Sequence, residues 1–379
     1  MTGRPPGELA IVMSGGGARA AYQVGLLRWL AKQDPNLRIP ILTGVSAGAI
    51  NAAYLATHSG SFGEKVEKLA DLWGHLTTEE VFRVDSFSLA RNVFRLVAKL
   101  ASGGAHLVAR SHAAVDTVPL GHLLERVLDA EDGRLPGIAR NLTEGVLRAV
   151  AITTSSYTSG QSITWVQGRD IAQWERAHRR SFNTEITVAH VMASGSLPLF
   201  FPAIQLAGGW YGDGGLRLTA PLSPAVHLGA DRILAISTRY VHRRAEADEP
   251  TTPGYPPPAV ILGAILNSIF LDQFDADALT MQRINNLLEV VPAMRERGFR
   301  PLRLLVLRPS ENLGRLANHY EAALPGSFRF LTRGLGTKEV RTNDLLSLLM
   351  FQPDYLSRLI ELGEQDAEAR KQEILDFLG

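Results

Sequence analysis

A single serine stands between two glycines in the run GVSAG, residues 44–48, where the character of the chain changes. Residues 39–43 are apolar and predict a strand, whereas the alanine-rich residues 47–56 predict a helix. A strand that turns at once into a helix needs crowded backbone angles, which flanking glycines relieve. Ser46 would then present its hydroxyl at a helix N-terminus, where partial positive charge favours an alkoxide. The alternative is a serine that only caps an ordinary turn.

A second glycine cluster, SGGGARAAYQVG at residues 14–25, follows a short apolar strand and opens a helix. The successive residues Gly15, Gly16 and Gly17 allow backbone N–H groups to converge on one anion. Arg19 adds a fixed positive charge. This loop therefore suits an oxyanion hole for acyl transfer.

The same glycine loop also fits a nucleotide-binding fingerprint, G-x-G-x-x-A from Gly15 to Ala20. The chain would then be an oxidoreductase that binds a dinucleotide. That alternative expects an acidic residue at the end of the second strand, to bind the ribose. The chain has TGVS there, and Asp34 lies in the preceding loop.

A serine nucleophile needs a base, and the segment GGWYGDGG at residues 208–215 offers Asp213 between glycines. The alternative for this aspartate is an ordinary Asp-Gly hairpin turn. A histidine base in the order Ser, Asp, His would have to be His227, His242 or His319, none of which lies in a glycine-framed turn. A histidine-dependent esterase stays an alternative that substitution of these three would test.

The bulk composition excludes several classes of protein. The 379 residues are 45% hydrophobic and 20% charged with net charge +1, so no overall charge favours nucleic acid. The chain has no cysteine, no calcium-loop pattern and no H-E-x-x-H, so we expect neither a metal nor another cofactor. We expect no signal peptide and no transmembrane segment, because the first apolar stretch covers only residues 9–13. The expected location is cytoplasmic or peripheral on a membrane surface.

The order of elements predicts an α/β fold. Strand and helix alternate over residues 1–60, which is typical of a parallel sheet covered by helices. Residues 146–167 predict a hairpin, and residues 231–238 and 302–307 predict further strands. After the proline-rich stretch 245–257 the chain is mostly helical, and its tail from about residue 343 predicts a closing helix pair.

Four segments in order resemble the patatin-like phospholipases: GGGARAAYQVGLL (15–27), GVSAGAINA (44–52), ASGSLPLFFPAI (193–204) and DGG (213–215). The resemblance implies a three-layer α/β/α fold with a mostly parallel central sheet and helices on both faces. Because the four segments lie within residues 1–240, we expect the catalytic core there. Residues 241–379 are expected to form a mostly helical C-terminal region with one late strand that completes the same globule.

The resemblance also implies the chemistry. Ser46 would be the nucleophile and Asp213 its base, with no histidine. Gly15, Gly16 and Gly17 would form the oxyanion hole, supported by Arg19. The chain would be a serine lipid acyl hydrolase of the phospholipase A or lysophospholipase type that works through an acyl-enzyme. The alternative on the same fold is a non-catalytic lipid-binding protein.

The substrate side is expected to be apolar. By resemblance the segment 193–204 lines an acyl pocket through Leu197, Leu199, Phe200 and Phe201, although a plain core role suits each of them equally. Residues 86–101 predict a basic amphipathic helix that would either contact a membrane surface or pack on the core. An apolar helix over residues 259–272 is a candidate pocket wall or partner surface. The expected partner is a lipid substrate, and the sequence does not fix the oligomeric state.

Overall fold

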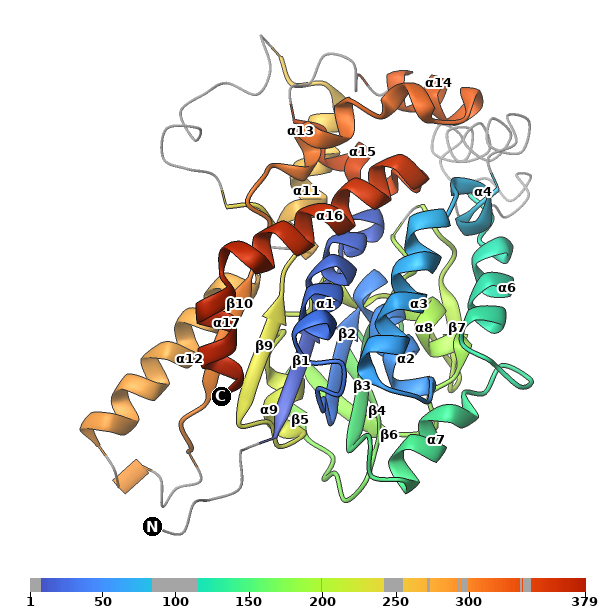
Figure 1. Ribbon diagram of the computed structural model, residues 1–379. Helices are drawn as coiled ribbons and strands as arrows, with labels where there is room; N and C mark the ends of the chain where they lie inside the picture. Colours follow the sequence, from blue (N-terminus) through green and yellow to red (C-terminus); the bar gives the residue numbers. More distant parts are fainter. Residues whose placement is uncertain are drawn as a thin grey trace.

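A mixed, mostly parallel sheet lies at the centre of the molecule (Figure 1). Strands β10, β9, β1, β2 and β3 lie in that order, and each neighbouring pair is parallel. Beyond them β3 pairs antiparallel with both β4 and β8, β8 pairs with β7, and β6 and β5 continue from β4. The strands are β1 Leu9–Met13, β2 Ile41–Val45, β3 Ala149–Ser156, β4 Ser162–Gly168, β5 Glu175–Arg176, β6 Arg179–Asn183, β7 Ile204–Leu206, β8 Gly209–Asp213, β9 Arg232–Ile236 and β10 Arg303–Leu307.

This computed structural model describes most of the chain, and some expectations fall outside it. The described residues are 8–83, 115–198, 200–241, 255–270, 273–291, 293–294, 299–334, 336 and 342–379. The amphipathic segment 86–101, Leu199 and His242 lie outside them. Only the last residues of the proline-rich stretch, from Tyr255, lie inside.

Alternating side chains of the central strand separate two apolar layers. Leu9, Ile11 and Met13 of β1 join one buried cluster, whereas Ala10 and Val12 join another. Helices α1 (Ala21–Gln33), α2 (Ala47–Thr57), α3 (Phe62–His75) and α16 (Pro353–Ala369) contribute to the first cluster. Helices α9 (Ser223–His227) and α12 (Gln273–Val290) contribute to the second. A two-residue period with both faces buried requires cover on both sides, so the predicted three-layer α/β/α fold is confirmed.

The local elements follow the sequence patterns closely. The predicted hairpin is β3 with β4, and the strands expected at 231–238 and 302–307 are β9 and β10. The helix expected over residues 259–272 is α11, Pro258–Phe270. The remaining helices are α4 Thr78–Val81, α6 Val118–Val127, α7 Pro136–Thr143, α8 Val188–Ser194, α13 Leu313–Asn318, α14 Gly326–Gly334, α15 Asp344–Leu349 and α17 Lys371–Leu378, with short 3-10 helices η1 Gly17–Ala20, η2 Gly214–Arg217 and η4 Glu321–Ala323.

The C-terminal region adds both a strand and a covering helix. β10 extends the sheet beyond β9, and α16 packs along α1. That crossing is close, because a Cβ on Gly25 of α1 would collide with the backbone of Ile360. The Tyr22 hydroxyl donates a hydrogen bond to Asp366 Oδ2 at 2.9 Å across the same contact. The tail forms three helices, α15, α16 and α17, where the sequence predicts a pair; the additional helix is the short α15.

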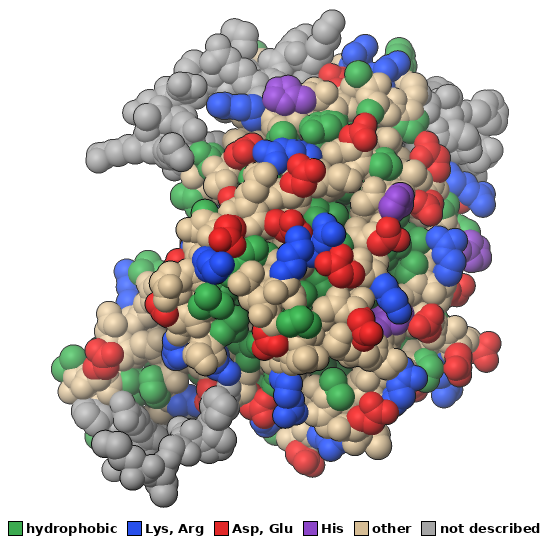
Figure 2. All heavy atoms as spheres, viewed as in Figure 1, with side chains coloured by type: hydrophobic (Ala, Val, Ile, Leu, Met, Phe, Trp, Pro, Cys, Tyr) green, Lys and Arg blue, Asp and Glu red, His purple; other side chains and the backbone are tan. Residues whose placement is uncertain are grey.

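The face over α1, α3 and α16 carries acidic and basic side chains side by side (Figure 2). Arg28 of α1 pairs with Glu67 of α3 at 3.0 Å, and Lys32 pairs with Glu364 of α16 at 2.9 Å. Exposed pairs of this kind add little stability. No helix within the described ranges is both long and apolar enough to cross a membrane.

Candidate active site

Ser46 occupies a strained turn between strand and helix. β2 ends at Val45 and α2 begins at Ala47, and Ser46 between them has φ 55° and ψ −131°. A positive φ is costly for a residue with a side chain and is typical of functional turns. The flanking glycines are required by contact, because a Cβ on Gly44 would collide with the backbone of Gly48. The predicted strand-to-helix elbow is therefore present, with the serine at its apex.

The end of α8 holds Ser46 in place. The Ser46 N–H donates a hydrogen bond to Ser194 Oγ at 2.9 Å, and Ser194 Oγ donates to the Thr153 carbonyl at 2.7 Å. Two residues later, the Ser196 carbonyl accepts a hydrogen bond from the Asp213 N–H at 2.9 Å. One short segment thus contacts the backbones of both predicted catalytic residues. From the sequence, this segment was expected to line the acyl pocket, and its contacts with the two backbones were not predicted.

Asp213 lies at the end of β8 and is only 1% exposed. Its Oδ1 accepts a hydrogen bond from the Gly215 N–H at 2.9 Å, whereas its Oδ2 is buried with no hydrogen-bond partner among the described residues. Burial raises the pKa of this carboxyl from 3.8 to about 7, and the Ser46 hydroxyl and the Gly215 N–H act in the opposite direction. The hydroxyl therefore lies beside the carboxyl, although no hydrogen bond of regular geometry joins them.

The glycine loop after β1 runs directly past the serine. A Cβ on Gly15 would lie 3.0 Å from Ser46 Cβ and 3.6 Å from Ser46 Oγ. The Gly15 carbonyl accepts a hydrogen bond from Thr238 Oγ1 at 2.7 Å. Because the peptide bond between Gly15 and Gly16 is trans, the Gly16 N–H points in the opposite direction to the Gly15 carbonyl, away from Thr238. Gly16 and Gly17 have φ 145° and 53°, which side chains rarely adopt.

Arg19 is buried, and its guanidinium reaches the C-terminal region. Its Nε donates a hydrogen bond to Ser347 Oγ at 2.7 Å, and its Nη2 pairs with Asp344 Oδ1 at 2.7 Å. Its Nη1 donates to Asn267 Oδ1 at 3.3 Å. No local pattern in the sequence predicts these partners, because they lie hundreds of residues from Arg19 along the chain. The support that Arg19 was expected to give the oxyanion loop stays a prediction.

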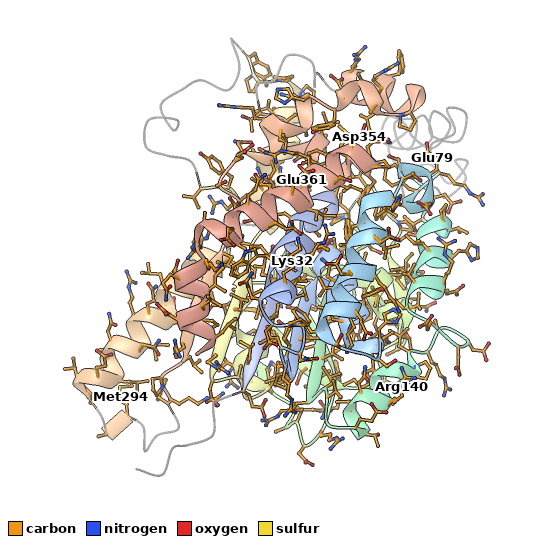
Figure 3. The ribbon with its side chains drawn as sticks, viewed as in Figure 1. Lys32, Glu79, Arg140, Met294, Asp354 and Glu361 are labelled. Atoms are coloured by element: carbon orange, nitrogen blue, oxygen red, sulfur yellow. The ribbon has the colours of Figure 1, made fainter. Side chains whose placement is uncertain are left out.

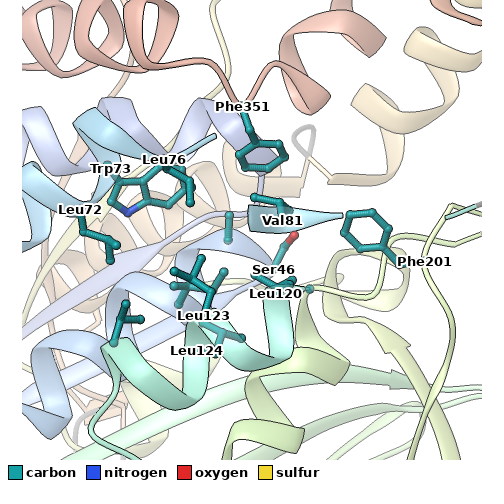
Figure 4. Close-up of a pocket in the computed structure, with 15 residues that line it drawn as sticks. Ser46, Leu72, Trp73, Leu76, Val81, Leu120, Leu123, Leu124, Phe201 and Phe351 are labelled. Atoms are coloured by element: carbon teal, nitrogen blue, oxygen red, sulfur yellow. The ribbon is translucent and has the colours of Figure 1, made fainter. Parts of the chain in front are cut away.

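An apolar cavity opens at Ser46 and continues between α2, α3 and α6 (Figure 4). Figure 4 shows Ser46 with Val81, Leu120 and Phe201 around it. Together with these residues, the cavity is lined by Gly17, Ala47, Ile50, Leu72, Trp73, Leu76, Leu123, Leu124, Val127, Gly195 and Phe351. A cavity of this chemistry suits a hydrocarbon chain.

The expected pocket residues divide between wall and core. Phe201 borders the apolar cavity, and Leu197 borders a neighbouring cavity that also reaches Ser46 and Asp213. Phe200 packs against the core without bordering either of these two cavities. The sequence did not predict that α3 and α6 line the pocket, because an apolar helix face is equally typical of ordinary core.

His227 and His319 are not among the residues that line the two cavities at Ser46. His227 stacks on Trp174 with ring centroids 4.6 Å apart, on the opposite apolar layer. His319 follows α13. Within the described ranges no cluster of three or more His, Cys, Asp or Glu could bind a metal ion.

Comparisons with known proteins place the chain in a family. No curated protein matches it. Similar solved structures include VipD from Legionella pneumophila (13% identity, 98% of this chain, 67% of that chain, TM-score 0.41) and human GIVD cytosolic phospholipase A2 (13%, 98%, 60%, 0.49). The type III effector ExoU is another (14%, 97%, 53%, 0.39), so this chain spans about half to two thirds of these proteins. The family model described as patatin-like phospholipase matches residues 11–226, more than half of the chain. This chain therefore belongs to the patatin-like phospholipase family.

Proposed function

We propose that this chain is a serine lipid acyl hydrolase that uses a Ser46–Asp213 dyad and forms an acyl-enzyme. Membership of a phospholipase family supports a lipid hydrolase. One observation carries the finer proposal: a buried carboxyl with an unpartnered oxygen lies beside a strained serine at the opening of an apolar cavity. A cap or a hairpin turn would need none of these features.

The acylation step uses the unusual basicity of Asp213. An ordinary carboxylate is a poor base for a hydroxyl, but a pKa of about 7 matches a general base to neutral pH. As Ser46 Oγ bonds to the ester carbonyl carbon, its proton passes to Asp213. The negative charge moves to the carbonyl oxygen, which the N–H groups of residues 15–17 stabilise. One such donor contributes roughly 3 kcal/mol of transition-state stabilisation.

The remaining steps return the enzyme to its starting state. Collapse of the tetrahedral intermediate breaks the ester C–O bond, and the leaving alcohol takes the proton from Asp213. Water then attacks the acyl-serine, with its proton passing to Asp213, and the second collapse returns that proton to Ser46 Oγ. The products are an alcohol or lysolipid and a fatty acid.

The apolar cavity supports an acyl ester as the substrate class. Phospholipids, lysophospholipids and neutral acyl esters all offer an ester carbonyl with a hydrocarbon chain on its acyl side. That chain would occupy the cavity between α2, α3 and α6 while the carbonyl lies at Ser46. Peripheral contact with a membrane would deliver such a substrate, and it stays a prediction.

The test compares hydrolysis of p-nitrophenyl butyrate and a lysophospholipid by wild type, Ser46→Ala and Asp213→Asn, with EDTA present. We expect both variants to lose at least about a thousandfold in kcat. The control is Asp277→Asn, because Asp277 also accepts a backbone hydrogen bond, from Leu222 at 2.8 Å, and burial also raises its pKa. It should keep wild-type activity.

Two results would contradict the proposal. Wild-type activity in Ser46→Ala would show that Ser46 is not the nucleophile and that the strand-to-helix turn has only a structural role. An inert wild type that binds fatty acid would favour the lipid-binding alternative, and one that binds NAD tightly would favour the oxidoreductase.

A further inference from the structure

The C-terminal segment 343–351 lies directly on the glycine loop. It contains α15 and follows the matched family region, which ends at residue 226. A Cβ on Gly17 would collide with the Leu348 carbonyl, so the two backbones touch. The loop expected to hold the oxyanion is therefore covered by a part of the chain that no motif marks.

This segment also forms wall around Ser46. Leu348, Leu349 and Phe351 line the cavity that reaches both Ser46 and Asp213. Phe351 in addition borders the deeper apolar cavity, where Figure 4 shows its ring near Val81 and Phe201. An acyl chain bound beside Ser46 would contact this segment.

Both ends of the segment are held by polar contacts that are buried or partly buried. At its start, Asp344 and Ser347 bind the Arg19 guanidinium, each at 2.7 Å. At its end, the Phe351 carbonyl accepts a hydrogen bond from Thr78 Oγ1 at 2.9 Å. The Gln352 amide donates back to the same hydroxyl at 2.9 Å. The segment thus joins η1, which carries Arg19, to α4, which begins at Thr78.

We propose that residues 343–351 are a substrate-binding element that forms one wall of the acyl pocket, and that Arg19 is a positioning residue that fastens this wall to the glycine loop. The proposal rests on the proposed hydrolase function. It gives the Arg19 charge a specific partner, since the Asp344 carboxylate lies against it. The ligand is the hydrocarbon part of an acyl ester.

Chain-length preference tests the wall. The measured quantity is the ratio of kcat/KM for p-nitrophenyl octanoate to kcat/KM for p-nitrophenyl acetate, because only the longer chain reaches the wall. Phe351→Ala should lower this ratio roughly tenfold, since a few lost methylene contacts are worth that factor. Phe351→Leu, which folds with less disturbance, should lower it by about threefold or less. An unchanged ratio in a folded Phe351→Ala would overturn the proposal.

The control is Phe299→Ala, the same chemical change far from the segment. Phe299 is 43% exposed, and its N–H bonds the Met294 carbonyl at 3.4 Å. Figure 3 places Met294 at the opposite end of the molecule from Glu79 and Asp354, which flank the anchored end of the segment. This variant should keep the wild-type ratio.

Arg19→Ala and Asp344→Asn test the fastening. Either change should lower the octanoate-to-acetate ratio, because each releases the wall. If Arg19 acted only through its charge on the oxyanion, Arg19→Ala would slow both esters by the same factor and leave the ratio unchanged. That result would overturn its positioning role.

A binding measurement separates this proposal from the hydrolase proposal. In a Ser46→Ala background, Phe351→Ala should weaken the affinity for the fluorescent fatty acid cis-parinaric acid roughly tenfold. Unchanged affinity would overturn the wall. If wild type hydrolyses neither ester while the affinity falls as expected, the hydrolase proposal fails and the pocket wall stands.

Discussion

The value of kcat/KM should depend on pH, because Asp213 must be ionised to accept the serine proton. With a pKa of about 7, about 1% of the carboxyl is ionised at pH 5 and about 90% at pH 8. The value of kcat/KM should therefore rise about 90-fold from pH 5 to pH 8. A carboxyl with its ordinary pKa of 3.8 would already be almost fully ionised at pH 5, and the profile would be flat.

Neither Tyr157, whose pKa responds to the Asp213 charge, nor the buried His190 of α8 changes its main protonation state between pH 5 and pH 8. Burial and the Asp213 charge raise the pKa of Tyr157 above 10, so Tyr157 stays neutral throughout. Burial lowers the pKa of His190 to about 4, so His190 is neutral above pH 5. A single ionisation should therefore dominate the profile of the free enzyme.

The assay needs a product whose detection does not change with pH. Release of octanoic acid from an ester, followed by chromatography, meets this need, whereas p-nitrophenol itself ionises in this range. An enzyme-free blank at each pH removes hydrolysis by hydroxide. A flat profile from pH 5 to pH 8 would refute the reasoning that burial tunes Asp213 as the base.

Asp213→Asn should be more stable than wild type above pH 7, by up to about 4 kcal/mol in the free energy of unfolding. The reason is that the pKa of Asp213 is raised in the folded state, so the wild-type protein loses stability as the pH rises from about 4 through about 7. Denaturant unfolding at pH 5 and pH 8 measures the difference in stability between the two proteins, which should widen with pH; a constant difference would contradict the prediction. Ser194→Ala should lower kcat roughly tenfold by freeing the Ser46 backbone, at a stability cost of about 1–3 kcal/mol. Its control, Ser181→Ala, also removes a buried hydroxyl that accepts a backbone N–H at 2.9 Å, from Trp174, and should lose stability without losing kcat.

Local patterns predicted the elements that position the serine. The β2 strand, the α2 helix and the two glycines around Ser46 all follow from residues within a few positions of one another. Steric contact at Gly44 explains why such a short pattern is informative. Strand periodicity likewise predicted the hairpin of β3 and β4, because its turn is local.

The parts that escaped prediction depend on contacts between distant segments. Ser194 lies 148 residues from the serine whose N–H it accepts, and Asp344 lies 325 residues from Arg19. Phe351 is one apolar residue among many, and nothing in its neighbourhood distinguishes a pocket wall from core. For Arg19 the sequence indicated a charge near the oxyanion, but only the fold shows which carboxylate lies against it.

The direction of β8 explains both the place and the basicity of Asp213. β1, β2 and β9 are parallel, so the glycine loop, Ser46 and Thr238 leave the sheet at one edge. β8 runs antiparallel to β3 and brings Asp213 opposite Thr154, back into that edge. An aspartate carried outward would meet solvent and keep an ordinary pKa, whereas this one is buried against the elbow. The strand order that brings the Asp213 carboxyl to Ser46 therefore also shields this carboxyl from solvent. That loss of hydration is the physical origin of its raised pKa.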